Sequence, residues 1–225
     1  CRHSHGIDVC NGWIADPNRA CCNPCDGTTE VLTVVTIPAV RLILKKIAES
    51  ITKPLSFNRL GNILKSAGAA IGKQTVINYV GYMMESYMLF TLQNYAAKLI
   101  QKETSPKYYF MDTGLLGLML MDCSSAQLEN LVAIELIRRF GREKVFYFEN
   151  NVEIDFYIPE EKLAIQVSMQ VLDQIETRER EIGAFLKLRN FIEGARCILI
   201  TNSEEAELDC DGIHVSVVPA WKWLL

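Results

Sequence analysis

The chain has 225 residues, of which 49% are hydrophobic and 22% charged, and its formal net charge is −4. These totals are ordinary for a globular protein and are large enough for two small domains, each with its own core. No apolar run approaches the roughly 18 residues that span a bilayer, and no signal peptide is visible. We therefore expect a cytoplasmic protein without a membrane partner.

The net charge hides a strong asymmetry along the chain. Residues 1–38 carry a net charge of −2, residues 39–118 carry +6, and residues 119–225 carry −8. A basic segment beside an acidic one predicts two units with different partners, and the basic unit is the candidate for binding double-stranded DNA.

Five of the eight cysteines lie within the first 25 residues. They include a single Cys-x-x-Cys pair, Cys22 and Cys25, and no second well-spaced pair that would complete a tetrahedral zinc site. The residues before Ile37-Pro38 lack a sustained periodic pattern, whereas a regular helical pattern begins directly after them. Residues 1–38 are therefore treated as an unassigned Cys-rich segment that is foreign to the domain that follows.

Between residues 39 and 118 the patterns predict three short helices followed by a two-stranded ribbon, which is the layout of a winged helix-turn-helix. The helices are expected near residues 40–51, 58–66 and 73–87, and the second strand near 107–111. In this layout the third helix is the recognition helix, although its polar face is equally suited to plain solvation. The polar side chains expected on that face are Lys73, Gln74, Thr75, Asn78 and Tyr82.

The hydrophobic pattern of residues 119–225 predicts a mixed sheet with helices packed against it, in the order αβββαβ plus one further strand. The helices are expected near residues 126–140 and 173–192, and the strands near 145–148, 153–158, 163–168, 196–201 and 214–218. The fold class expected for the whole chain is α+β (mixed α/β), with a restriction-endonuclease-like second domain.

The strongest chemical signal lies in two of these strands. Asp155 lies in one strand, and Gln166-Val167-Ser168 lies in the next, where one nuclease superfamily has an acid-x-lysine triplet that helps to build a Mg²⁺ site. We expect Asp155 to be the anchor ligand for Mg²⁺ and Glu129 of the preceding helix to reach the ion directly or through water. Gln166 still offers an amide oxygen and completes the degenerate catalytic set.

The weak point of this site is Ser168, because it cannot supply the cation that a lysine would place near the attacking water and the phosphate. Lys162 or Arg178 is a candidate to replace that cation from another element. Glu153 faces the same side of its strand as Asp155, since side chains alternate with period two.

Several motifs in order resemble one prokaryotic protein family. They are residues 109–116 (Tyr-Phe-Met-Asp-Thr-Gly-Leu-Leu), residues 128–136 around Leu-Glu-Asn, residues 153–156 (Glu-Ile-Asp-Phe) and residues 165–168 (Ile-Gln-Val-Ser). The sequence from about residue 40 to 225 resembles the C-terminal region of an AAA+ ATPase family: a winged helix followed by a PD-(D/E)XK-nuclease-like domain of unknown function. The resemblance carries over Glu129 and Asp155, whereas the family's Glu-Val-Lys is Gln-Val-Ser here.

The resemblance implies a parent protein with an N-terminal module that binds ATP and Mg²⁺, and no such module is found in this chain. The stretch from Gly68 to Thr75 is one residue short of a phosphate-binding loop, so we do not expect ATP to bind here. We expect a DNA- or protein-binding region with an inactive nuclease fold, which is not an enzyme by itself. The alternatives are an active Mg²⁺-dependent nuclease with a relocated lysine and a structural oligomerisation tail.

Overall fold

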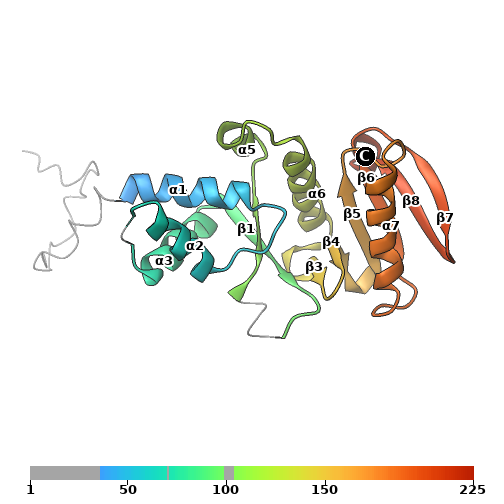
Figure 1. Ribbon diagram of the computed structural model, residues 1–225, viewed down its shortest axis with the longest axis horizontal. Coiled ribbons are helices and arrows are strands. Elements are labelled where there is room, and N and C mark those ends of the chain that lie inside the picture. Colours follow the sequence, from blue (N-terminus) through green and yellow to red (C-terminus); the bar gives the residue numbers. More distant parts are fainter. Residues whose placement is uncertain (1–35, 70, 99–103) are drawn as a thin grey trace, which may run out of the picture. The chain divides into compact units, whose positions relative to one another are not determined.

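The computed structural model describes residues 36–69, 71–98 and 104–225, so nearly all of the predicted Cys-rich segment lies outside the described residues. Residues 37–225 form one compact unit (Figure 1). In the described ranges this unit consists of an eight-stranded mixed sheet and its surrounding helices, which confirms the predicted mixed α+β class.

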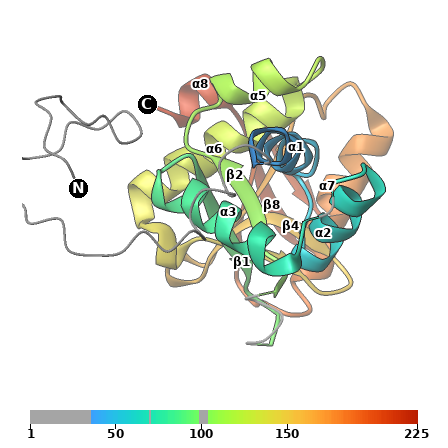
Figure 2. The same ribbon diagram turned by 90° about the vertical axis from the view of Figure 1, so that its left-hand side faces the viewer.

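The first part of the unit contains three helices: α1 (Thr36–Glu49), α2 (Phe57–Ser66) and α3 (Lys73–Glu85). Helix α2 begins one residue before its predicted start, and Ser56 caps it, since its hydroxyl accepts a hydrogen bond from the backbone nitrogen of Arg59 at 3.2 Å. Figure 2 shows the three helices grouped at the end of the sheet where β1 and β2 lie.

The two-stranded ribbon after these helices belongs to the main sheet. Strand β1 (Leu89–Asn94) pairs antiparallel with β2 (Lys107–Phe110) and also pairs parallel with β3 (Phe146–Glu149). The carboxamide of Asn94 strengthens the second junction by bonding both the backbone oxygen and the backbone nitrogen of Glu149, at 2.9 and 3.0 Å. One sheet therefore continues across the predicted boundary between residues 118 and 119, and the division into two domains stays a prediction.

Strands β4 (Glu153–Ile158) and β5 (Leu163–Ser168) are the central antiparallel pair that carries the predicted site. The sheet order is β2-β1-β3-β4-β5-β6-β8-β7. Its far side is built from β6 (Arg196–Thr201), which is parallel to β5, then β8 (Ile213–Pro219), and β7 (Ala206–Cys210) at the edge.

Helices α6 (Ser124–Phe140) and α7 (Ile175–Leu188) cover opposite faces of the sheet. Successive side chains of a strand point to opposite faces. On β5, Ile165 packs in the same apolar cluster as Val132 of α6, whereas Ala164 packs in a second cluster with Phe185 of α7. The first cluster also extends through β1 and β2 to α1, α2 and α3, so one core joins these helices to the sheet.

The shorter helices are α5 (Gly114–Met119) before α6, the 3-10 helices η2 (Arg142–Lys144) and η3 (Pro159–Glu161), and α8 (Ala220–Trp223) after β8. Among the described residues, no helix combines the length and the apolar character needed to cross a membrane.

The paired registers of β4 and β5 end at Phe156 and Ile165, before the strands themselves end. Beyond this point Asp155 and Gln166 lie opposite each other, and each bridge joins a backbone nitrogen of one strand to a side-chain oxygen of the other: Asp155 N donates to Gln166 Oε1, and Val167 N donates to Asp155 Oδ2. The strands therefore diverge at one end of the sheet, between α6 and α7, and the predicted site lies there.

Candidate functional site

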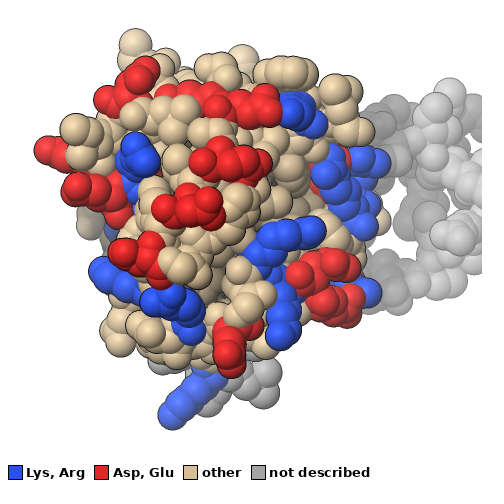
Figure 3. Space-filling view, turned by 90° about the vertical axis from the view of Figure 1, so that its right-hand side faces the viewer, with Lys and Arg blue, Asp and Glu red and all other residues tan. Residues whose placement is uncertain are grey.

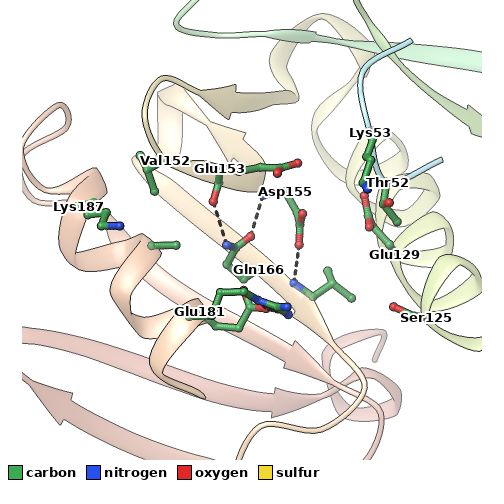
Figure 4. Close-up of a pocket in the computed structure, with 13 residues that line it drawn as sticks. Thr52, Lys53, Ser125, Glu129, Val152, Glu153, Asp155, Gln166, Glu181 and Lys187 are labelled. Atoms are coloured by element: carbon green, nitrogen blue, oxygen red, sulfur yellow. Dashed lines mark hydrogen bonds and ion pairs between the residues drawn. The ribbon is translucent and has the colours of Figure 1, made fainter. Parts of the chain in front are cut away.

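A cavity of about 440 Å³ opens at the divergent ends of β4 and β5 (Figure 4). It is lined by side chains of α6, α7, β4, β5 and the segment that follows α1. The predicted catalytic residues Glu129, Asp155 and Gln166 all contribute to its wall. The structure thus brings together three residues from three elements, α6, β4 and β5, while their roles stay predictions.

Three carboxylates gather at the inner wall of this cavity. Glu129 comes from α6 and is 5% exposed, whereas Glu153 and Asp155 come from β4, with side chains that are 50% and 17% exposed. A carboxylate that is buried without a partner is costly, so such a group requires a counter-ion or several hydrogen bonds.

The counter-ion is Lys107 of β2, which sequence analysis did not select. Its side chain is fully buried, and its Nζ lies 2.9 Å from Oε1 of Glu153, 3.7 Å from Oδ1 of Asp155 and 4.0 Å from Oε1 of Glu129. Among the described residues it is the one buried side-chain nitrogen or oxygen that lacks a hydrogen bond of suitable angle. Lys107 and the three carboxylates are called the buried charge cluster below.

The two cations suggested from the sequence do not join this cluster. Lys162 lies in the turn that connects β4 to β5, at the opposite end of both strands from Asp155. Arg178 belongs to α7, but its neighbour Arg180 lines the cavity instead. Ser168, at the position of the family's lysine, is buried and donates its hydroxyl to the backbone oxygen of Gln170 at 3.2 Å.

Both ends of the Gln166 carboxamide are already engaged. Its Oε1 accepts a hydrogen bond from the backbone nitrogen of Asp155 at 2.8 Å, and its Nε2 donates to the backbone oxygen of Glu153 at 3.0 Å (Figure 4). The carboxylate of Asp155 in turn accepts a hydrogen bond from the backbone nitrogen of Val167 at 2.9 Å. Gln166 therefore links the two strands where their backbone pairing has ended.

Burial controls the proton affinity of the cluster. It raises the pKa of Glu129 from an ordinary 4.5 to about 8, and the negative charge of Asp155 adds to this effect. Burial also raises the pKa of Asp155, although Lys107 opposes the change. Burial alone would lower the pKa of Lys107, but the three carboxylates outweigh it and raise that pKa. Lys107 therefore stays charged at neutral pH, and Glu129 and Asp155 are the groups of the cluster whose affinity for a proton is increased by burial.

The described residues do not fit a magnesium centre. No three acidic, histidine or cysteine side chains within the described ranges converge on a point that holds a metal ion. Mg²⁺ requires about six oxygens at roughly 2.0–2.1 Å in octahedral geometry. Here the shared neighbour of the carboxylates is an ammonium, and the amide oxygen of Gln166 is occupied by a backbone nitrogen.

The predicted DNA-binding residues lie on α3, away from the cavity lining. Lys73, Gln74 and Asn78 are exposed, whereas Thr75 is half-buried. Gln74 donates a hydrogen bond from Nε2 to Oδ1 of Asn78 at 3.1 Å, so the two amides form an ordered pair on the helix surface. Tyr82, one turn further along, is 61% exposed.

The part of the chain around α3 is strongly basic. Residues 36–98 contain eight lysine and arginine residues and two glutamates. By contrast, Figure 3 shows the face at the other end of the unit, where acidic side chains crowd the upper left and are interspersed with lysines and arginines elsewhere. That face offers no continuous basic surface.

Comparison with known proteins gives two matches. The model of a family described as "Domain of unknown function (DUF8612)" matches residues 29–126. The chain is also similar to "Uncharacterized protein MJ1544" of Methanocaldococcus jannaschii, with 27% identity over 203 residues. That alignment covers 86% of this chain and 46% of the archaeal protein, so the chain spans about half the length of this relative. No solved structure matches the chain.

Proposed function

We propose that this chain is the DNA-binding C-terminal region of an AAA+ ATPase-like protein, and that its nuclease-like domain does not cleave DNA. The observation that supports the DNA-binding role is the exposed surface at the start of α3, which carries Lys73 and the ordered amide pair of Gln74 and Asn78. The parent ATPase is proposed from the motif resemblance, and the greater length of the archaeal relative agrees with it.

The chemistry of the α3 face suits a DNA groove. Asn and Gln side chains pair with adenine in the major groove, while lysine contacts phosphates without regard to sequence. The helix follows a short α2 and precedes an antiparallel ribbon, which is the order of a winged helix. The basic excess around α3 would add the general attraction for the DNA backbone.

The non-cleaving role follows from the buried charge cluster. A phosphodiesterase of this type needs a metal ion and a cation that reaches the substrate. The lysine present here is fully buried behind the carboxylates and takes the central position between them. Glu129, Asp155 and Gln166 then position the strand ends and do not perform catalysis.

The test is a fluorescence anisotropy titration of the purified chain with a labelled DNA duplex at several salt concentrations. We expect binding whose log affinity falls linearly with log salt, and Lys73→Ala should reduce the magnitude of that slope by about one. Lys162→Ala is the control, because it removes an exposed lysine that lies in the turn between β4 and β5 and not on α3. An unchanged slope in Lys73→Ala would contradict the assignment of α3.

The two alternatives are decided by companion measurements. The presence of Lys107 near Asp155 favours an active nuclease as the second candidate function, with Lys107 as the relocated lysine. Nicking of supercoiled plasmid that requires Mg²⁺ or Mn²⁺ and disappears in Asp155→Asn would establish it. An oligomerisation tail predicts concentration-dependent self-association by light scattering and no DNA binding.

A further inference from the structure

The buried charge cluster places the ammonium of Lys107 among three carboxylates, and no acidic, histidine or cysteine side chains of the described residues are arranged to hold a metal ion. Its three carboxylates come from α6 and β4, and Lys107 reaches them from β2, the edge strand at the other side of β1 and β3. The Nζ atom lies between 2.9 and 4.0 Å from one oxygen of each carboxylate. These separations are those of ion pairs and are much longer than bonds to Mg²⁺.

Each buried carboxylate is also held by a donor of the protein itself. The hydroxyl of Tyr109 donates to Oε1 of Glu129 at 2.9 Å, and the backbone nitrogen of Val167 donates to Oδ2 of Asp155 at 2.9 Å. Tyr109 and Lys107 project from the same face of β2, since they are two residues apart. One strand therefore supplies both the cation and a hydrogen-bond donor to the acidic wall.

An ammonium that is covalently part of the chain differs from a metal in three ways. It carries one positive charge, it has no coordination geometry to satisfy, and it is present at any metal concentration. Its repulsion of a second cation is large, because like charges about 4 Å apart interact strongly where the effective dielectric is low. A divalent ion therefore competes poorly for these carboxylates while Lys107 is charged.

We propose that Lys107 is a built-in cation that takes the place of a divalent metal in this nuclease-like site. We expect these carboxylates to accept a divalent metal only when the charge of Lys107 is removed. This inference rests on the proposed non-cleaving role, but its test requires no DNA.

The test is isothermal titration of the metal-free whole chain with MnCl₂ and MgCl₂, together with thermal unfolding in each salt. We expect no saturable binding by the wild type at the cluster. Lys107→Met should gain one saturable site for Mn²⁺, with an affinity at least about tenfold above any residual binding by the wild type. Adding Asp155→Asn to Lys107→Met should remove that site.

Lys53→Met is the matched control. Lys53 also lines the cavity but is exposed and forms no ion pair with the cluster, so its removal should create no metal site. Should Lys107→Met not fold, the double variant Lys107→Met/Glu153→Gln removes one charge of each sign, and the same gain over Glu153→Gln alone is expected.

Two results would overturn the inference. One is wild-type Mn²⁺ binding that is lost in Asp155→Asn, because the metal would then coexist with Lys107. The other is a folded Lys107→Met, or double variant, without any gain in metal affinity. DNA binding of the same variants is measured separately, so failure of the DNA-binding proposal is recognised independently of these outcomes.

Discussion

Gln166 and Asp155 continue the pairing of β4 and β5 through a side chain. The backbone nitrogen of Asp155 donates to Oε1 of Gln166 at 2.8 Å, one position beyond the last paired residues, Phe156 and Ile165. The residue that replaces the acid of the resembling family is therefore a link between two diverging strands. An amide suits this position because it both donates and accepts, whereas an ionised carboxylate only accepts.

Introducing the acid of the resembling family with Gln166→Glu should destabilise the protein. The change removes the donor to the backbone oxygen of Glu153 and places a fourth carboxylate beside the buried charge cluster. We expect a loss of about 2–4 kcal/mol in the free energy of unfolding, measured by urea denaturation. The exposed Gln170→Glu is the control and should change stability by less than about 0.5 kcal/mol. Equal stability of the two variants would show that the link is unimportant.

Replacing Asn130 of α6 should lower the free energy of unfolding by a similar amount, because its carboxamide holds the edge strand β2. Its Oδ1 accepts from the backbone nitrogen of Phe110 at 2.8 Å, and its Nδ2 donates to the backbone oxygen of the same residue at 2.9 Å. The side chain is fully buried, so Asn130→Ala leaves two backbone groups unpaired. We expect a loss of about 2–4 kcal/mol, against little change for the exposed Asn190→Ala. A loss below about 1 kcal/mol would mean that water replaces both bonds.

Glu129 should make the protein less stable as the pH rises. Its pKa is raised from 4.5 to about 8 in the folded protein, so between these values the folded state holds more protons than the unfolded state. Stability therefore falls with increasing pH across this window, by up to about 1.4 kcal/mol per pH unit. Asp155, whose pKa is also raised, contributes with the same sign, and Lys107 does not titrate in this range.

The measurement is urea denaturation of the wild type and Glu129→Gln at a series of pH values. In Glu129→Gln the free energy of unfolding should change much less with pH than in the wild type. Relative to the wild type, the variant should therefore gain stability toward the alkaline end of the window. Glu193→Gln, which changes an exposed glutamate, should retain the wild-type slope. A wild-type stability that rises with pH across the window would show that the cluster is not protonated in the folded protein.

Much of the fold was predictable because local patterns and tertiary contacts agree. The helices α2, α3 and α6 and the strands β4, β5 and β6 lie close to the predicted ranges. The missed strand β7 is short, acidic and at the sheet edge, so it lacks an apolar run. Its signal was the Asp211-Gly212 turn, where both residues have positive φ, 47° and 79°. Such a pair is typical of a tight β-hairpin.

The site was predictable only in part, for a physical reason. Asp155 and Gln166 lie on neighbouring strands, so strand alternation and a short connection were enough to place them together. Lys107 reaches them from a strand about fifty residues earlier in the chain, and no local pattern encodes that approach. The one available signal was a lysine at the start of a strand that otherwise consists of buried aromatic residues, Tyr108, Tyr109 and Phe110.

Glu135 of α6 should stabilise the protein at pH values above the pKa that its carboxyl group has in the unfolded chain. This stabilisation should be lost in acid. Arg138 binds its carboxylate with two hydrogen bonds of 2.7 and 2.6 Å, and Arg139 binds it as well. The hydrogen bond from Arg138 is the main reason that the pKa of Glu135 is lowered from 4.5 to about 2. The stabilisation is therefore complete above pH 4.5 and disappears as the pH falls through about 2.

Glu135 also orders the C-terminal helix, because Arg139 donates to the backbone oxygen of Trp223 at 2.7 Å and stacks on its ring at 4.4 Å. Glu135→Gln should cost about 2 kcal/mol at neutral pH, and its difference from the wild type should shrink toward pH 2, as measured by urea denaturation. The fluorescence of Trp223 should change with this substitution, because the guanidinium loses its orientation. A constant difference between the two proteins down to the lowest pH would instead assign the loss to packing of α6.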